Sequence, residues 1–324
     1  MSDHSTGSGA PSTGALPPTP PPTAPGRSRW TWLRLLWALP TGRFGIIVAI
    51  AVVVTAIVSL FWTPFDPQRV DIAERWQLPG WPHVLGTDGT GRDILSLVMA
   101  GARTTVIVAV GAGIVATVVG IALAALGALT ARWVRESVAV FVDILIAFPV
   151  LIIAMMISAV WGGSLWVVIW SVGIGFGVNI ARVTRPELRR VLQSDFVLAG
   201  RASGLTPAQN LLRHLLPNVA PVFIVQLSWA MAVAVLAEAG LSYLGFGAPV
   251  TEPSWGLLLA QLQQYITVYP LSVVPPGLAI TITVLGLNLL GDALREATDP
   301  TLSHGRDPLH PPRAAIRHEP EVVS

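Results

Sequence analysis

Residues 194–218 read SDFVLAGRASGLTPAQNLLRHLLPN, a polar stretch with two arginines that lies between long apolar runs. Gly204 and Pro207 lie close together in its middle, and glycine commonly ends helices whereas proline commonly opens them. After this break, leucines recur at helical spacing, at positions 211, 212, 215 and 216. We therefore predict a helix, a break and a second helix, with an apolar back and a front that carries arginine.

The composition is that of a membrane protein. Apolar residues make up 52% of the 324 residues and charged residues 12%, whereas soluble domains carry roughly a quarter of charged residues. The chain has no Cys, which excludes disulfides, thiol catalysis and cysteine-ligated metals. Its six His are scattered without metal-ligand spacing, so we expect no metal site.

Six apolar segments are long enough to cross the hydrocarbon core, which takes about 20 helical residues. Asp143 interrupts the third segment, and Pro149 is expected to bend it because proline removes a helical hydrogen bond. The sequence thus predicts an all-α polytopic membrane protein with six transmembrane helices. These helices are expected at about residues 44–62, 104–130, 137–160, 165–182, 219–245 and 271–294.

Both ends of the chain are expected to be cytoplasmic tails. Residues 1–26 are mostly Pro, Ser, Thr, Gly and Ala, which cannot bury enough apolar surface to offset the entropy of ordering, so we predict disorder. We expect no signal peptide there, because the first apolar run begins too late. Residues 296–324 are charged and rich in Pro.

The remainder divides into two regions. Residues 27–101 are expected to hold an interfacial helix rich in Trp and Arg, the first transmembrane helix and an external loop with a short helix near 94–100. Residues 102–295 are expected to form the main transmembrane domain, including the polar loop 194–218 and a short helix at about 255–265.

The arginines predict the orientation, because loops rich in Arg stay in the cytoplasm. All 20 basic residues are Arg. With the N-terminus inside and alternating helices, sixteen of them lie on the cytoplasmic side and four outside. We therefore expect both termini, and the polar loop 194–218, in the cytoplasm.

The polar loop resembles the EAA loop of ABC importer permeases, whose pattern is Glu-Ala-Ala, three residues, Gly, nine residues and Ile-x-Leu-Pro. Leu198 stands where the family has Glu, Gly200 where it has Ala, and His214 where it has Ile. In that family the loop forms a coupling helix that docks in a cleft of the ATPase subunit. The resemblance implies an ATPase-coupling role for Ala199, Gly200, Arg201, Gly204, His214, Leu216 and Pro217.

Four further stretches resemble the C-type subunit of the dipeptide, oligopeptide and nickel branch of these permeases. They are HVLGTD at 83–88 with GRD at 91–93 and GAR at 101–103, DILIAFP at 143–149, EAGLSYLG at 238–245 with PSWG at 253–256, and NLLGD at 288–292. Together the matches extend from about residue 30 to residue 302. They imply a type I ABC importer transmembrane domain.

The resemblance also implies partners and a location. It implies a multi-pass subunit of the bacterial inner membrane that binds no cofactor itself and pairs with a second homologous permease. ATP and Mg²⁺ would be held by two ATP-binding subunits, and an extracytoplasmic substrate-binding protein would deliver cargo, with membrane lipid around the chain and no nucleic acid. The cargo would be di- or oligopeptides or a related small ligand such as nickel.

Gly86 and Gly91 have the spacing of a phosphate-binding loop, but that motif requires Lys and then Ser or Thr after the second glycine. Here Arg92 and Asp93 follow, on the expected outer face. We therefore expect neither a nucleotide site nor catalytic residues in this chain.

Polar residues within the apolar segments are candidates for the transport pathway or for helix packing. Burying a carboxylate in the membrane is costly, so Asp143 and Glu238 are functional candidates by default, although we favour structural roles, with Asp143 paired to Arg135 or to an arginine of the polar loop. Polar side chains also form hydrogen bonds between helices. The further candidates are Asn179, Gln226, Trp229 and Asn288.

Three other interpretations stay open from the residues alone. The polar loop is also consistent with an amphipathic helix that lies on the membrane. A secondary transporter that uses an ion gradient would need inverted repeats with broken helices, which we do not detect. An intramembrane enzyme would need a nucleophile and a base inside the helices, whereas His83 and His214 are expected in loops.

Overall fold

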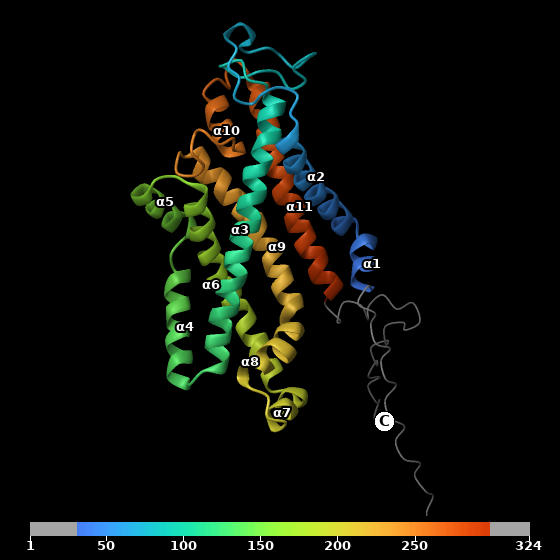
Figure 1. The fold of residues 1–324 in the computed structure, drawn as a ribbon, viewed down its shortest axis with the longest axis vertical. Helices are drawn as coiled ribbons and strands as arrows, with labels where there is room; N and C mark the ends of the chain where they lie inside the picture. The colour runs from blue at the N-terminus through green and yellow to red at the C-terminus, as the bar shows by residue number, and fades with distance from the viewer. Residues whose placement is uncertain (1–30, 299–324) are drawn as a thin grey trace, which may run out of the picture.

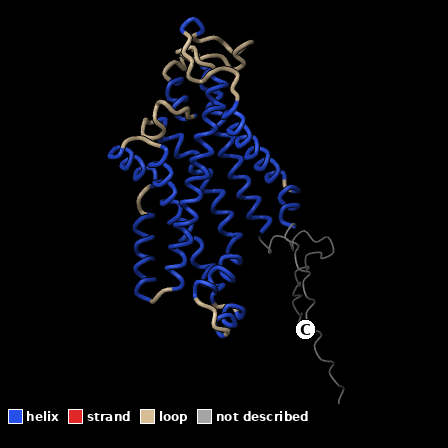
Figure 2. The backbone as a smooth tube through the Cα atoms, in the orientation of Figure 1, coloured by secondary structure: helices blue, strands red, loops and turns tan. Residues whose placement is uncertain are grey.

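The structure is a computed structural model that describes residues 31–298, which form an elongated bundle of helices (Figure 1). Within these residues no strand occurs, so the predicted all-α class is confirmed (Figure 2). Five stretches are long and apolar enough to cross a membrane. They are α2 (Pro40–Phe61), α3 (Ile94–Leu129), α6 (Leu165–Leu192), α9 (Leu216–Tyr243) and the stretch Pro270–Thr298 that contains α11 (Val274–Thr298).

The third expected helix is not one straight span. It forms two helices, α4 (Arg132–Ile146) and α5 (Val150–Trp161), bent by 80° at a short break. Pro149 has no N–H to continue the helix and restricts Phe148 before it, so the chain turns at this point. If the bent pair counts as one span, the described residues hold six.

Two expected boundaries were wrong. The short helix expected near Ile94–Ala100 is the start of α3, which continues through Gly101 for 36 residues. Asp93 begins this helix by accepting a hydrogen bond from the Ser96 N–H at 2.7 Å. The other error concerns α6, which runs to Leu192 rather than to residue 182, so its arginines lie on a continuous helix.

Shorter helices lie at both ends of the bundle. The helix expected in the interfacial segment is α1 (Thr31–Ala38), and the one expected at 255–265 is α10 (Trp255–Gln263). At the opposite end from α10 lie α7 (Asp195–Ala202) and α8 (Pro207–Asn210) (Figure 1). The predicted tail 1–26, and all but the first residues of the tail 296–324, lie outside the described residues.

Small residues bring α3 and α6 into close contact along the middle of the bundle, and we call this contact the α3–α6 seam. A Cβ atom at Gly177 of α6 would lie 2.6 Å from Val119 Cβ of α3, and one at Gly173 would lie 2.6 Å from Val115 Cβ. From the other side, a Cβ at Gly120 would lie 2.8 Å from Ile180 Cγ2. Such close approach is how helices gain packing energy in a bilayer, where burial of apolar surface gives little.

A second seam of this kind joins α2 to α11. A Cβ at Gly286 would lie 2.6 Å from Val48 Cγ1, and one at Gly45 would lie 2.6 Å from the Gly286 carbonyl oxygen. The α1 segment extends this contact, because Leu36 and Leu39 are buried against the last turns of α11. The amino-terminal helices are thus fixed to the carboxyl-terminal one.

The α3–α6 seam predicts that Gly177→Ala destabilises the protein. The added methyl group overlaps Val119, so we expect the free energy of unfolding to fall by about 1–3 kcal/mol. Thermal melting of the detergent-solubilised protein, followed by tryptophan fluorescence, measures this. Gly240→Ala is the matched control, because nothing lies within 4 Å of a Cβ at that helical glycine. Equal melting temperatures for the two variants would contradict the prediction.

Candidate functional site

The polar loop folds into a compact unit that extends beyond the ends of α3 and α4 (Figure 1). It consists of α7, α8 and a π-helical turn at Leu211–Leu215, and we call residues 195–215 the α7–α8 unit. Arg201 lies in α7 and His214 in the π-helical turn. Leu216 and Pro217 open α9, where proline fits the first turn of a helix.

Local hydrogen bonds produce the break between α7 and α8. The N–H of Leu205 donates to the Gly200 carbonyl at 3.1 Å, which closes α7 around Gly204. Gly204 has a φ of +82°, a value that glycine adopts without strain. Thr206 and Gln209 then cap α8 reciprocally: the Gln209 N–H donates to Thr206 Oγ1 at 3.3 Å and the Thr206 N–H donates to Gln209 Oε1 at 2.9 Å.

Three fully buried side chains anchor this unit to the bundle. Val197 of α7, Leu215 of the π-helical turn and Val219 of α9 are each 0% exposed. They pack with Leu188 and Val191 at the end of α6 and with Ala124 of α3. Ala199 and Gly204, in contrast, are exposed. The unit therefore combines a rigid attachment to three long helices with an outward surface available for contact.

A groove next to this unit contains one of the predicted pathway residues. Gln226 lines a groove of about 710 Å³ between the cytoplasmic halves of α6, α9 and α11. Glu187, Arg190 and Arg295 line it as well. This places a polar surface of α9 near the α7–α8 unit.

The other pathway candidates do not gather in one cavity. Asp143 is exposed on α4 and forms no ion pair with Arg135, so that expected pairing was wrong, whereas the side chain of Arg201 in the polar loop lies outside the description and that alternative stays a prediction. Asn179 is half-buried in α6, and Asn288 of α11 has a buried carbonyl oxygen without a partner among the described residues. Trp229 is 51% exposed on α9 and packs edge-on against Phe176, with ring centroids 6.1 Å apart.

Glu238 is 1% exposed and joins α9 to the loop that precedes α10. Its Oε1 accepts hydrogen bonds from Ser242 Oγ at 2.7 Å and from Ser254 Oγ at 2.8 Å. Ser242 Oγ in turn accepts from the Ala248 N–H at 2.8 Å, and Ser254 is the N-cap of α10. The geometry gives this carboxyl group a packing role at the extracytoplasmic end.

Loop 62–93 forms a cap at that end through residues to which the sequence assigned no role. His83 is 2% exposed, and its Nδ1 lies 3.0 Å from Asp93 Oδ1 while its Nε2 lies 3.3 Å from Glu74 Oε2. Since Asp93 caps α3, this contact ties the loop to a transmembrane helix. The sequence contained a signal for Asp93 as the N-cap of α3, because Asp followed by an apolar run is typical of a helix start.

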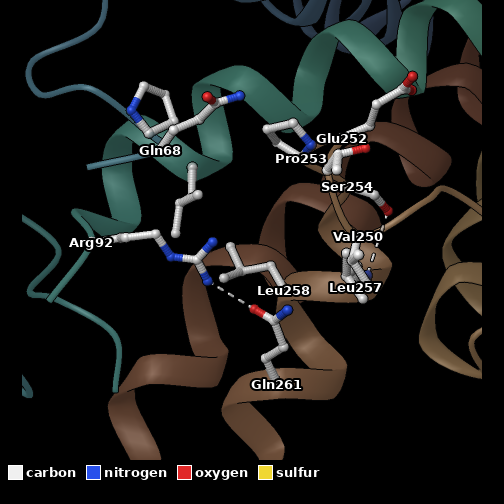
Figure 3. Close-up of a pocket in the computed structure, with 12 residues that line it drawn as sticks. Gln68, Arg92, Val250, Glu252, Pro253, Ser254, Leu257, Leu258 and Gln261 are labelled. Atoms are coloured by element: carbon white, nitrogen blue, oxygen red, sulfur yellow. Dashed lines mark hydrogen bonds between the residues drawn. The ribbon is translucent and has the colours of Figure 1, made fainter. Parts of the chain in front are cut away.

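An extracytoplasmic cavity of about 230 Å³ lies between this cap and α10 (Figure 3). Arg92 reaches across it: its guanidinium donates to Asp88 Oδ2 at 2.8 Å and to Gln261 Oε1 at 3.0 Å. Glu252 lines the same cavity and is exposed. Arg92 therefore links the cap to α10.

Comparison with known proteins places these features in a family context. Residues 116–304 match the family described as "Binding-protein-dependent transport system inner membrane component". A protein of Brucella suis that is provisionally named a peptide transport system permease is 35% identical over 263 residues, which cover 80% of this chain and 88% of that protein. A second B. suis protein, provisionally named a peptide permease, is 31% identical over 79% of this chain and 86% of its own length.

A third relative comes from another bacterium. The dipeptide transport system permease protein of Alkalihalophilus pseudofirmus is 31% identical over 258 residues, which cover 80% of this chain and 85% of that protein. Each of the three relatives thus aligns with about four fifths of this chain.

The Glu238 network predicts different effects for two substitutions. Glu238→Gln keeps a carbonyl oxygen that accepts from both serines, but its amide NH2 replaces Oε2, which is buried without a partner among the described residues, so we expect a melting temperature between those of the unchanged protein and the Leu variant. Glu238→Leu leaves two buried hydroxyl donors without an acceptor, which costs about 1–3 kcal/mol for each group. Melting in detergent separates the two variants, and a Gln variant as unstable as the Leu variant would contradict the importance of the acceptor.

Proposed function

This chain belongs to the family of binding-protein-dependent transport system inner membrane components, the permease subunits of ABC importers, and on that premise we propose that it forms a pathway for peptides. It is a multi-pass protein of the bacterial inner membrane. The family consists of transport subunits rather than enzymes. The names of its relatives, which specify peptides and dipeptides, support di- or oligopeptides as the cargo ahead of nickel or another small ligand.

We propose that the complete transporter contains a second homologous permease, two ATP-binding subunits and an extracytoplasmic substrate-binding protein. The observation that carries this proposal is the α7–α8 unit, which extends from the cytoplasmic end and is anchored by three fully buried side chains. ATP and Mg²⁺ would be bound by the ATPase partners, because the Gly86–Gly91 loop lacks the phosphate-binding residues and lies at the opposite end.

The anchoring suggests how movement is transmitted. When the ATPase subunits close, they would carry α7 with them. Because Val197 is packed against the end of α6 and Leu215 leads directly into α9, a displaced α7 would move both long helices. The pathway between the two permeases would then switch from facing inward to facing outward.

The docking surface would depend mainly on shape. The family's acidic residue is replaced by Leu198, which removes one charge from the contact. What the chain retains is the fixed angle between α7 and α8, set by Gly204 and by the reciprocal cap of Thr206 and Gln209.

We predict that Gly204→Val uncouples ATP hydrolysis from uptake while much of the complex still assembles. Nothing lies within 4 Å of a Cβ at Gly204, so the change adds no clash, but a β-branched residue at φ +82° strains the backbone by about 1–3 kcal/mol and alters the turn. Peptide uptake per ATP hydrolysed, measured in proteoliposomes with all subunits, should fall several-fold. Gly204→Asn should be milder, because asparagine tolerates this conformation.

Gly162→Val is the matched control. Gly162 has a φ of +85° and equally open surroundings, but it lies at the far end of α5. Its ψ of 151° lies in a region that only glycine adopts readily, so valine there should carry at least as much strain, without loss of coupling. Unaltered uptake per ATP in Gly204→Val, or equal loss in both variants, would overturn the coupling role, and ion-driven uptake without ATPase subunits would indicate a secondary transporter.

A further inference from the structure

An open groove of about 720 Å³ lies between the cytoplasmic ends of α3, α4 and α6, and neither the α7–α8 unit nor the proposed pathway uses it. Four arginines line it, with Glu136 as the one acidic lining residue. Glu136 is already paired, because its Oε1 lies 2.8 Å from Arg132 Nε. The arginines are Arg132, Arg135, Arg185 and Arg189.

The remaining three arginines have no acidic partner among the described residues. The guanidinium groups of Arg135 and Arg189 form no hydrogen bond or ion pair there. Asp143, about two turns farther along α4, is near enough to act electrostatically on Arg185 but forms no ion pair with any of the three. The groove therefore holds three arginines without an ion-pair partner among the described residues.

Arg185 shows that this charge is held in place. Its Nη2 donates to the Arg135 carbonyl at 3.2 Å, and its Nε would lie 3.7 Å from a Cβ at Gly127, so its stem passes close to α3. The Nε–H is buried and has no acceptor in the described structure. Leaving a buried donor unpaired costs free energy. The Arg185 Nε–H therefore needs an acceptor from outside the described residues, and a negatively charged group would suit the neighbouring arginines.

The position of the groove indicates where that acceptor comes from. Trp133 is 72% exposed in the first turn of α4, and tryptophan is typical of the boundary between headgroups and acyl chains. Farther along α4, Val140, Phe141 and Ile144 are each more than half exposed. A basic recess at the headgroup level thus continues into an apolar surface.

We propose that this groove binds an acidic phospholipid, with its phosphate among the arginines and its acyl chains along the exposed side of α4. Guanidinium groups match phosphate oxygens with paired hydrogen bonds. Acidic lipids are attracted to basic pockets between helices on the cytoplasmic side. A free phosphate ion would satisfy the arginines but would leave the apolar surface next to them unused.

The test uses the full-length chain expressed with its transporter subunits, purified in detergent and stripped of lipid. Native mass spectrometry would count bound phosphatidylglycerol and phosphatidylcholine during titration with each lipid. Arg135→Gln combined with Arg189→Gln removes two guanidinium groups that have no internal partner, so the fold should persist. We expect phosphatidylglycerol to bind this double variant at least about tenfold more weakly, with phosphatidylcholine binding unchanged.

Two further variants make the test specific. Arg190→Gln removes one positive charge from α6 next to Arg189 but outside the groove, where Arg190 is exposed and paired with Glu187, and it should bind phosphatidylglycerol normally. Lysine at both 135 and 189 should restore part of the binding, because the charge returns without the paired donors. Equal affinity in the Gln double variant and the unchanged protein would overturn the proposal. So would equal loss in Arg190→Gln, or displacement of the lipid by millimolar inorganic phosphate.

Discussion

Val115 and Val119 of α3 lie directly over Gly173 and Gly177 of α6, and the distance between these two helices leaves no room for a methyl group. In a bilayer the hydrophobic effect does not drive helices together, so van der Waals contact at such close packing supplies the stabilising energy. Both helices also carry functional features at their ends. α3 begins at the extracytoplasmic cap through Asp93, and α6 ends beside the α7–α8 unit. The seam therefore connects the two faces of the protein.

Most polar contacts of the bundle lie at its ends, not at its middle. Glu238 joins α9 to the loop before α10, and His83 joins the external cap to α3. Among the described residues on the cytoplasmic side, Arg132 and Arg190 form ion pairs, whereas Arg135 and Arg189 form none. This asymmetry is physically reasonable, because the extracytoplasmic loops must be held together by the chain itself, whereas the cytoplasmic face has lipid headgroups and the proposed subunits as partners.

Local signals in the sequence predicted the class of fold and much of the α7–α8 unit. Hydrophobic length identified the five long spans and the apolar stretch that forms the bent pair α4 and α5, and Gly204 and Pro207 marked the break between α7 and α8. The sequence did not predict the start of α3, because residues 94–101 are expected in the external region, whereas Gly101 lies within the helix and packs beside Trp255. The sequence also could not predict that Asp143 is exposed or that the pathway candidates lie apart. Both depend on how each helix is rotated about its axis and on packing between segments that are distant in the chain.

The reciprocal cap between Thr206 and Gln209 has a consequence for the kinetics of assembly. Both hydrogen bonds form within the chain, as does the bond from Leu205 to Gly200 that closes α7. A surface that is already ordered loses little conformational entropy when another protein binds it. Association with a partner can then proceed as the meeting of two preformed surfaces, with an encounter rate limited by orientation and not by local folding.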